Sequence, residues 1–133
     1  MRIIYIFICI LLLLICQGCN IEKGENFLNL IVPKNLEDST LIFIIPGSGC
    51  SGCITSVEEE AFIHANEKRY FFVFTRIRSK KLFKQRFRSI LLAKNILIDS
   101  LNLFEYQEKD KEIYPVLYEK AGGAIHFKKY FEP

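Results

Sequence analysis

The feature that most constrains the fold is an uninterrupted apolar run from Thr40 to Ile45, which is closed by Pro46 and Gly47. A strand that is apolar at successive positions has both faces buried, which is typical of the inside of a parallel or mixed sheet. The pair Cys50 and Cys53 follows directly, and after it apolar residues recur with helical spacing through residues 54–68: Val57, Ala61, Phe62 and Ala65. This order predicts a cysteine pair at the start of a helix.

The rest of the chain continues the alternation of strands and helices. A second buried strand is predicted at Tyr70 to Thr75, and a third, shorter one at Asn95 to Asp99. Between them, Ser79 to Lys94 predicts a basic helix with an inward apolar stripe of Phe83, Phe87, Ile90 and Leu91. Two apolar segments, 114–118 and 124–127, flank a Gly-Gly pair and predict a terminal hairpin. The pattern predicts an α/β fold with a mixed sheet.

The N-terminus has the composition of an export signal: Arg2, an apolar stretch from Ile3 to Cys16, and then Gln17-Gly18-Cys19. As a helix, that stretch would span only about 21 Å, which is less than the roughly 30 Å hydrocarbon core of a bilayer. The segment resembles a bacterial lipoprotein signal. That resemblance implies lipidation of Cys19 and a membrane-anchored protein of the bacterial cell envelope, facing the periplasm or the exterior. Ordinary cleavage at the same place would also leave Cys19 as the first residue.

This interpretation divides the chain into three parts. Residues 1–18 are expected to be the signal peptide. Residues 19–38 are expected to be a tether, polar through Asn26, with a candidate peripheral strand from Phe27 to Val32. Residues 39–133 are expected to form the folded domain.

Composition excludes several classes of protein. After residue 18 the chain has 115 residues with 17 Lys+Arg against 15 Asp+Glu, enough for one small domain. Its aromatic and β-branched content is too high for a disordered chain, and it lacks the further long apolar runs of a multi-span membrane protein. With almost balanced charge, the chain shows no basic excess that would indicate a nucleic-acid partner.

The number of cysteines that remain in the mature chain limits the chemistry we expect of it. Of five cysteines, Cys9 and Cys16 leave with the signal and Cys19 is used by the lipid. Only Cys50 and Cys53 remain, in an oxidising compartment, where they are either a structural disulfide or a redox pair. A structural bridge across so short a loop would contribute only about 2 kcal/mol in the chain-entropy estimate.

From about Thr40 to Tyr130, the order of elements and motifs resembles that of thioredoxin-like thiol-disulfide oxidoreductases, especially small exported ones tethered to membranes. This resemblance implies a three-layer α/β/α fold with a mixed central sheet. It also implies that Pro115 is cis and packs against the cysteines, and that the backbone of Tyr114 binds an extended substrate peptide. The implied partners are exported proteins that contain cysteines, together with a redox partner.

The expected position of the cysteine pair at a helix N-terminus agrees with thiol-disulfide exchange. Unpaired N–H groups and the helix dipole favour negative charge at a helix N-terminus, so we expect a lowered pKa for Cys50. Cys50 would be the attacking catalytic thiolate and Cys53 the resolving thiol, without a metal or organic cofactor. The chain departs from the family pattern because no Trp precedes Cys50 and no acid lies in the strand before it. The three adjacent glutamates of the following helix, Glu58 to Glu60, are expected to form a solvated face.

Two alternatives to the oxidoreductase interpretation come from other functional classes. Gly47-x-x-Cys50-x-x-Cys53 also resembles the Cu(I)-binding loop of heavy-metal-associated domains. A non-catalytic binding lipoprotein with the same loop is the other alternative. A zinc site would need both His64 and His126, which we expect instead to be an ordinary helix-surface residue and a strand residue.

A basic run without a single acid lies after the second predicted strand. It is expected either to be a solvated helix face or to attract anionic lipid or an acidic partner. Its members are Arg76, Arg78, Lys80, Lys81, Lys84, Arg86 and Arg88.

Overall fold

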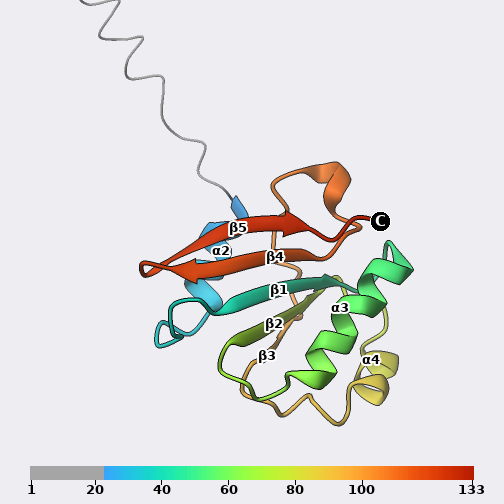
Figure 1. Cartoon of the computed structure of the whole chain (residues 1–133). Helices are drawn as coiled ribbons and strands as arrows, with labels where there is room; N and C mark the ends of the chain where they lie inside the picture. Colours follow the sequence, from blue (N-terminus) through green and yellow to red (C-terminus); the bar gives the residue numbers. More distant parts are fainter. Residues whose placement is uncertain (1–22) are drawn as a thin grey trace, which may run out of the picture.

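The computed structural model describes residues 23–133 and contains one five-stranded mixed sheet with three α-helices (Figure 1). The expected signal peptide and Cys19 lie outside the described residues. The elements in chain order are α2 (Lys23–Ile31), β1 (Leu41–Pro46), α3 (Ser51–Ile63), β2 (Tyr70–Thr75), α4 (Lys80–Arg86), β3 (Ile96–Asp99), the 3₁₀ helix η1 (Lys109–Lys111), β4 (Val116–Ala121) and β5 (Ala124–Tyr130).

The strand order is β3-β2-β1-β4-β5. Strand β1 pairs in parallel with β2, and β2 in parallel with β3. On the other side β4 pairs antiparallel with β1, and β5 antiparallel with β4. The expected mixed α/β sheet and its terminal hairpin are therefore confirmed. The hairpin turns at Gly122 and Gly123, which both have positive φ, as a tight two-residue turn requires.

Hydrophobic side chains of the central strands are buried on both sheet faces, as the continuous apolar run predicts. Ile42 and Ile44 of β1 belong to a cluster with Leu28 of α2 and Phe104. Phe43 and Ile45 belong to the other cluster, which also contains side chains from α3 and the segment after α4: Ile54, Val57, Ala61, Phe87 and Ile90. Helix α3 and Phe83 of α4 thus pack on one face, and in Figure 1 α3 lies in front of the sheet with α4 beside it.

The region before β1 differs from the expectation. Phe27 to Val32 was expected to be a strand and the residues through Asn26 a polar tether, but helix α2 begins at Lys23 and ends at Ile31. Gly24, Leu28 and Val32 are buried, and this four-residue spacing places them on one helical face. A Cβ atom at Gly24 would lie 2.8 Å from the Tyr118 hydroxyl, so the helix packs tightly on the sheet. The folded domain therefore includes residues before 39.

The basic helix is also shorter than expected. It ends at Arg86 rather than near Lys94, and the chain continues in turns. The N–H of Ile90 donates to the carbonyl of Phe87, and that of Ala93 to the carbonyl of Ile90. Such three-residue bonds tighten the chain and bury Phe87, Ile90 and Ala93 together. None of the helices within residues 23–133 is long and apolar enough to cross a membrane.

Candidate functional site

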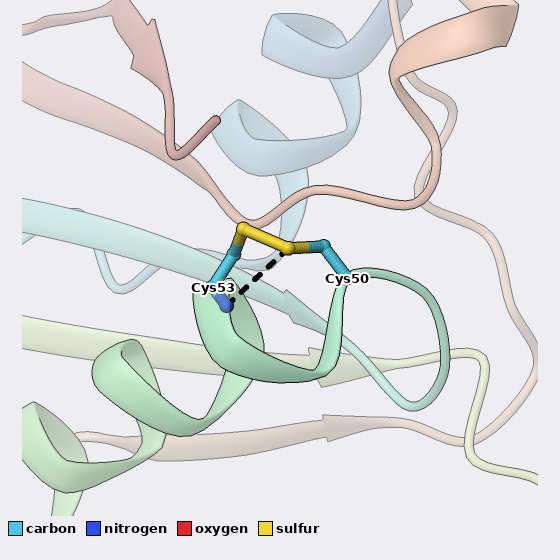
Figure 2. The surroundings of a disulfide bond; sticks show 2 residues. All are labelled: Cys50 and Cys53. Carbon is cyan, nitrogen blue, oxygen red and sulfur yellow. Dashed lines mark hydrogen bonds between the residues drawn. A yellow bond between two sulfur atoms is a disulfide. The ribbon is translucent and has the colours of Figure 1, made fainter. Parts of the chain in front are cut away.

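The loop after the central strand carries the two cysteines to the start of α3. Cys50 is the N-cap residue of this helix, and the N–H of Cys53 donates to the Cys50 sulfur at 3.4 Å. The two side chains form a disulfide with their Cα atoms 5.3 Å apart, as Figure 2 shows. The prediction that the cysteine pair opens a helix is confirmed. The Cys50 sulfur lies where helix N–H groups point, a position that favours a thiolate after reduction.

The loop before β4 packs directly against the cysteine loop. The N–H of Cys50 donates to the carbonyl oxygen of Ile113 at 3.0 Å. Gly49 has φ +143°, and a Cβ atom there would lie 2.1 Å from the same oxygen. Gly49 is therefore required both by its backbone conformation and by the close approach of Ile113. Sequence reasoning missed Ile113, because nothing in its own type or spacing indicates this contact.

The peptide bond between Tyr114 and Pro115 is not cis. No cis peptide bond occurs within residues 23–133, so that expectation is wrong. The N–H of Tyr114 donates to the Lys111 carbonyl at 3.0 Å in a turn that follows η1, and an X-Pro bond intrinsically favours trans by about 0.5–1 kcal/mol. Pro115 is buried, and its carbonyl accepts from the Phe131 N–H at 2.9 Å. The binding of an extended substrate peptide by the backbone of Tyr114 stays a prediction.

A shallow pocket of about 320 Å³ borders the disulfide. One side is formed by Cys50, Gly52, Cys53 and Ser56, and the other by Phe131, Glu132 and Pro133. Glu132 forms an ion pair with Lys111 at 2.7 Å, and this hydrogen bond raises the pKa of Lys111. The chain after β5 thus forms one wall of the candidate site. The sequence contained no signal for this, because these residues are about eighty positions from the cysteines.

A second ion pair fixes the loops around the cysteine segment. The Arg76 guanidinium donates to Glu112 at 2.6 Å and lies 5.1 Å from the centre of the Tyr106 ring. This hydrogen bond lowers the pKa of Glu112 and raises that of Arg76. Glu112 immediately precedes Ile113. The pair therefore connects the end of β2 to the carbonyl that holds Cys50.

The glutamates of α3 do not all face solvent. Glu59 is exposed and Glu60 is half-buried, but the side chain of Glu58 is buried and forms an ion pair with Arg86 of α4. Burial raises the pKa of Glu58, and the Arg86 charge opposes this shift. The expectation of a solvated face is thus wrong for Glu58, because α4 packs over that position. Its carboxylate lines a pocket of about 230 Å³ between α3, α4 and the loop at Gly47.

The histidines lie on different elements. His64 caps the C-terminal end of α3, stacks on the Tyr70 ring at 3.9 Å and lies 3.2 Å from Glu60, so it is more constrained than an ordinary surface residue. His126 is an exposed residue of β5, as expected for a strand residue. Across residues 23–133, no three His, Cys, Asp or Glu side chains gather as a group that could hold a metal ion.

Comparison with protein-family models, with curated proteins and with solved structures finds no match to this chain. The geometry itself establishes a mixed α/β fold with parallel core strands and a Cys-x-x-Cys disulfide at the start of a helix.

Proposed function

We propose that this protein is a thioredoxin-like thiol-disulfide oxidoreductase that acts on protein disulfides through Cys50 and Cys53. The observation that carries the proposal is the disulfide at the N-terminus of α3, where the Cys50 sulfur accepts the Cys53 N–H. Cysteine pairs in that position are stabilised as thiolates and exchange readily.

The arrangement of the elements supports the same family. The cysteine loop follows the central strand β1, a helical connection leads to the parallel strand β2, and an antiparallel hairpin closes the sheet. With α3 and α4 on one face and α2 on the other, we interpret the domain as a three-layer α/β/α fold. The trans bond before Pro115 is the main departure from what the resemblance implies.

The proposed reaction starts from the disulfide seen here. A thiolate of a partner protein attacks the Cys50 sulfur, so a mixed disulfide forms, the Cys50–Cys53 bond breaks and its electron pair passes to the Cys53 sulfur. A second partner thiolate then attacks the mixed disulfide and releases Cys50 as a thiolate. Two electrons and two protons pass from the partner dithiol to the cysteine pair, and the partner leaves as a disulfide. The reverse sequence reduces a partner.

The test is a redox titration of the mature chain in defined glutathione and dithiothreitol buffers, with the dithiol fraction measured by alkylation and mass spectrometry. A reversible couple in the range of known oxidoreductases, about −120 to −270 mV, supports the proposal. A potential below about −300 mV would indicate a structural disulfide instead. Protection of both reduced thiols by stoichiometric Cu(I) would favour the metal-binding alternative.

We further propose that the protein is exported and anchored in a bacterial cell-envelope membrane by lipid on Cys19. The support is the sequence pattern of residues 1–19. Replacement Cys19→Ala should move the protein from the membrane fraction to the soluble exported fraction. Retention of the variant in membranes would contradict lipid anchoring.

A further inference from the structure

The segment after β2 presents an unusual excess of positive charge. Residues 76–98 contain eight Lys and Arg and no Asp or Glu. Arg76 and Arg86 form ion pairs with Glu112 and Glu58. The other six are exposed and form no ion pair with any residue that the structure describes. One of them, Lys94, lies just before β3. The other five lie in or beside α4, and we call them the cationic surface: Arg78, Lys80, Lys81, Lys84 and Arg88.

The cationic surface begins beside the cysteine loop. Gly47 is three residues before Cys50, and a Cβ atom on it would lie 2.5 Å from the carbonyl oxygen of Arg76. The pocket that contains Glu58 is lined by Gly47 on one side and by Arg78 and Ser79 on the other. Three residues span at most about 11 Å, so the first cations lie on the same end of the sheet as the disulfide.

The direction of this surface argues against a membrane as its target. Helix α2, which follows the proposed anchor, packs through Leu28 on one sheet face, together with Val32 directly after it. The segment from Phe83 to Ile90 packs on the opposite face. In Figure 1 the start of α2 and helix α4 lie at opposite sides of the domain. A domain anchored through α2 would therefore turn its cationic surface away from the membrane.

We infer that the cationic surface docks an acidic protein surface, so that the exchange partners of Cys50–Cys53 carry Asp and Glu beside their cysteines. This inference rests on the proposed function and names the partner class. Leu82 lies among these cations and is 65% exposed, so it would add an apolar contact to the docking surface. Complementary charge accelerates encounter by about 10- to 1,000-fold in favourable cases, and the effect decreases with salt.

The experiment measures reduction of the Cys50–Cys53 disulfide by two dithiol peptides that differ only in Glu or Lys flanks. Flanking charge also changes the thiol pKa of a peptide, so each rate is divided by that of the same peptide with hydroxyethyl disulfide. We expect the acidic peptide to react about 10-fold faster at about 0.01 M salt, where the Debye length is about 30 Å. The ratio should approach 1 at about 1 M salt.

Variants that neutralise selected lysines test whether the acidic peptide binds at the cationic surface. The double variant Lys80→Gln with Lys84→Gln should reduce the acidic-to-basic ratio several-fold. The matched control is Lys34→Gln with Lys68→Gln, because both lysines are exposed and lie toward the amino end of β1 and β2, away from the disulfide. It should leave the ratio unchanged. Equal normalised rates at low salt, or an equal loss in the control, would overturn the inference.

Two further measurements distinguish failure of the proposed function from failure of the docking inference, and a lipid from a protein partner. Reduction by dithiothreitol, which is uncharged, reports on the disulfide itself, so failure there would contradict the proposed function rather than the docking surface. Vesicles of 70% phosphatidylcholine and 30% phosphatidylglycerol test the lipid alternative on the Cys19→Ala protein. Binding that the Lys80, Lys84 double variant loses would assign the surface to anionic lipid and overturn the protein partner.

Discussion

The N–H of Cys50 donates to the carbonyl oxygen of Ile113, which joins the first cysteine of the disulfide to the loop before β4. The bond is made possible by Gly49, whose missing side chain leaves room for Ile113. Two segments more than sixty residues apart in the sequence therefore hold Cys50 at the start of α3.

Replacement Gly49→Ala should destabilise the protein. Its φ of +143° is unfavourable for a residue with a Cβ atom, and that atom would collide with the Ile113 backbone. We expect a loss of about 1–3 kcal/mol in the free energy of unfolding, measured by urea denaturation of the oxidised protein. The control is Gly52→Ala, because a Cβ atom there meets nothing within 4 Å. It should stabilise α3 by up to about 1 kcal/mol, and equal losses in both variants would contradict the role of Ile113.

The pair Arg76 and Glu112 should produce a pH dependence of stability. Because the hydrogen bond lowers the pKa of Glu112 in the folded protein, its contribution is present above the unfolded value of about 4.3 and is lost as pH falls through the folded pKa. Both side chains are about one-third exposed, so the contribution should be below about 1 kcal/mol. Urea unfolding between pH 7 and pH 3 should show a smaller loss for Arg76→Gln than for the unmodified protein. An identical loss would exclude this contribution.

The sequence predicted those parts of the fold that depend on local periodicity. Continuous apolar runs identified β1 and β2 because both strands are buried on two faces. Helix α2 was missed because Leu30, which is 83% exposed, gave the segment an almost continuous apolar pattern that masked its four-residue spacing. The contacts that complete the site depend on tertiary packing. Neither the Ile113 carbonyl beside Cys50 nor the burial of Glu58 under α4 has a local signature.

The pair Glu58 and Arg86 should show the opposite pH dependence. Burial raises the pKa of Glu58 in the folded protein, so the protonated form is favoured by folding. Its contribution to stability is present below about pH 4.3 and is lost as pH rises through the folded pKa. Relative to Glu58→Gln, the unmodified protein should therefore lose stability over that rise, measured by urea unfolding. A parallel pH profile in the two proteins would contradict the shift.

Removing the partner cation tests the same pair at neutral pH. Arg86→Gln leaves the Glu58 carboxylate buried without its counter-charge and should destabilise the protein by about 1–3 kcal/mol at pH 7, and by less at pH 4. Arg88→Gln is the matched control, since Arg88 is exposed and has no ion pair within residues 23–133. We expect a change within about 0.5 kcal/mol for it. Equal effects of the two variants would indicate that Arg86 acts through the net charge of the protein and not through its ion pair with Glu58.

The two cysteines should have different roles, because only Cys50 caps α3 and accepts a backbone N–H at its sulfur. In the Cys53→Ser variant the attack by Cys50 survives, but no second thiol resolves the mixed disulfide, so partner proteins should remain attached to Cys50. In Cys50→Ser, the remaining thiol lies one turn into the helix and should trap few partners. The measurement is the yield of mixed disulfides on non-reducing gels after acid quenching, with release by dithiothreitol as the control. Equal trapping by both variants would contradict the assignment of Cys50 as the attacking residue. Absence of trapping in either, together with equal alkylation rates of the two reduced thiols, would contradict the oxidoreductase proposal as a whole.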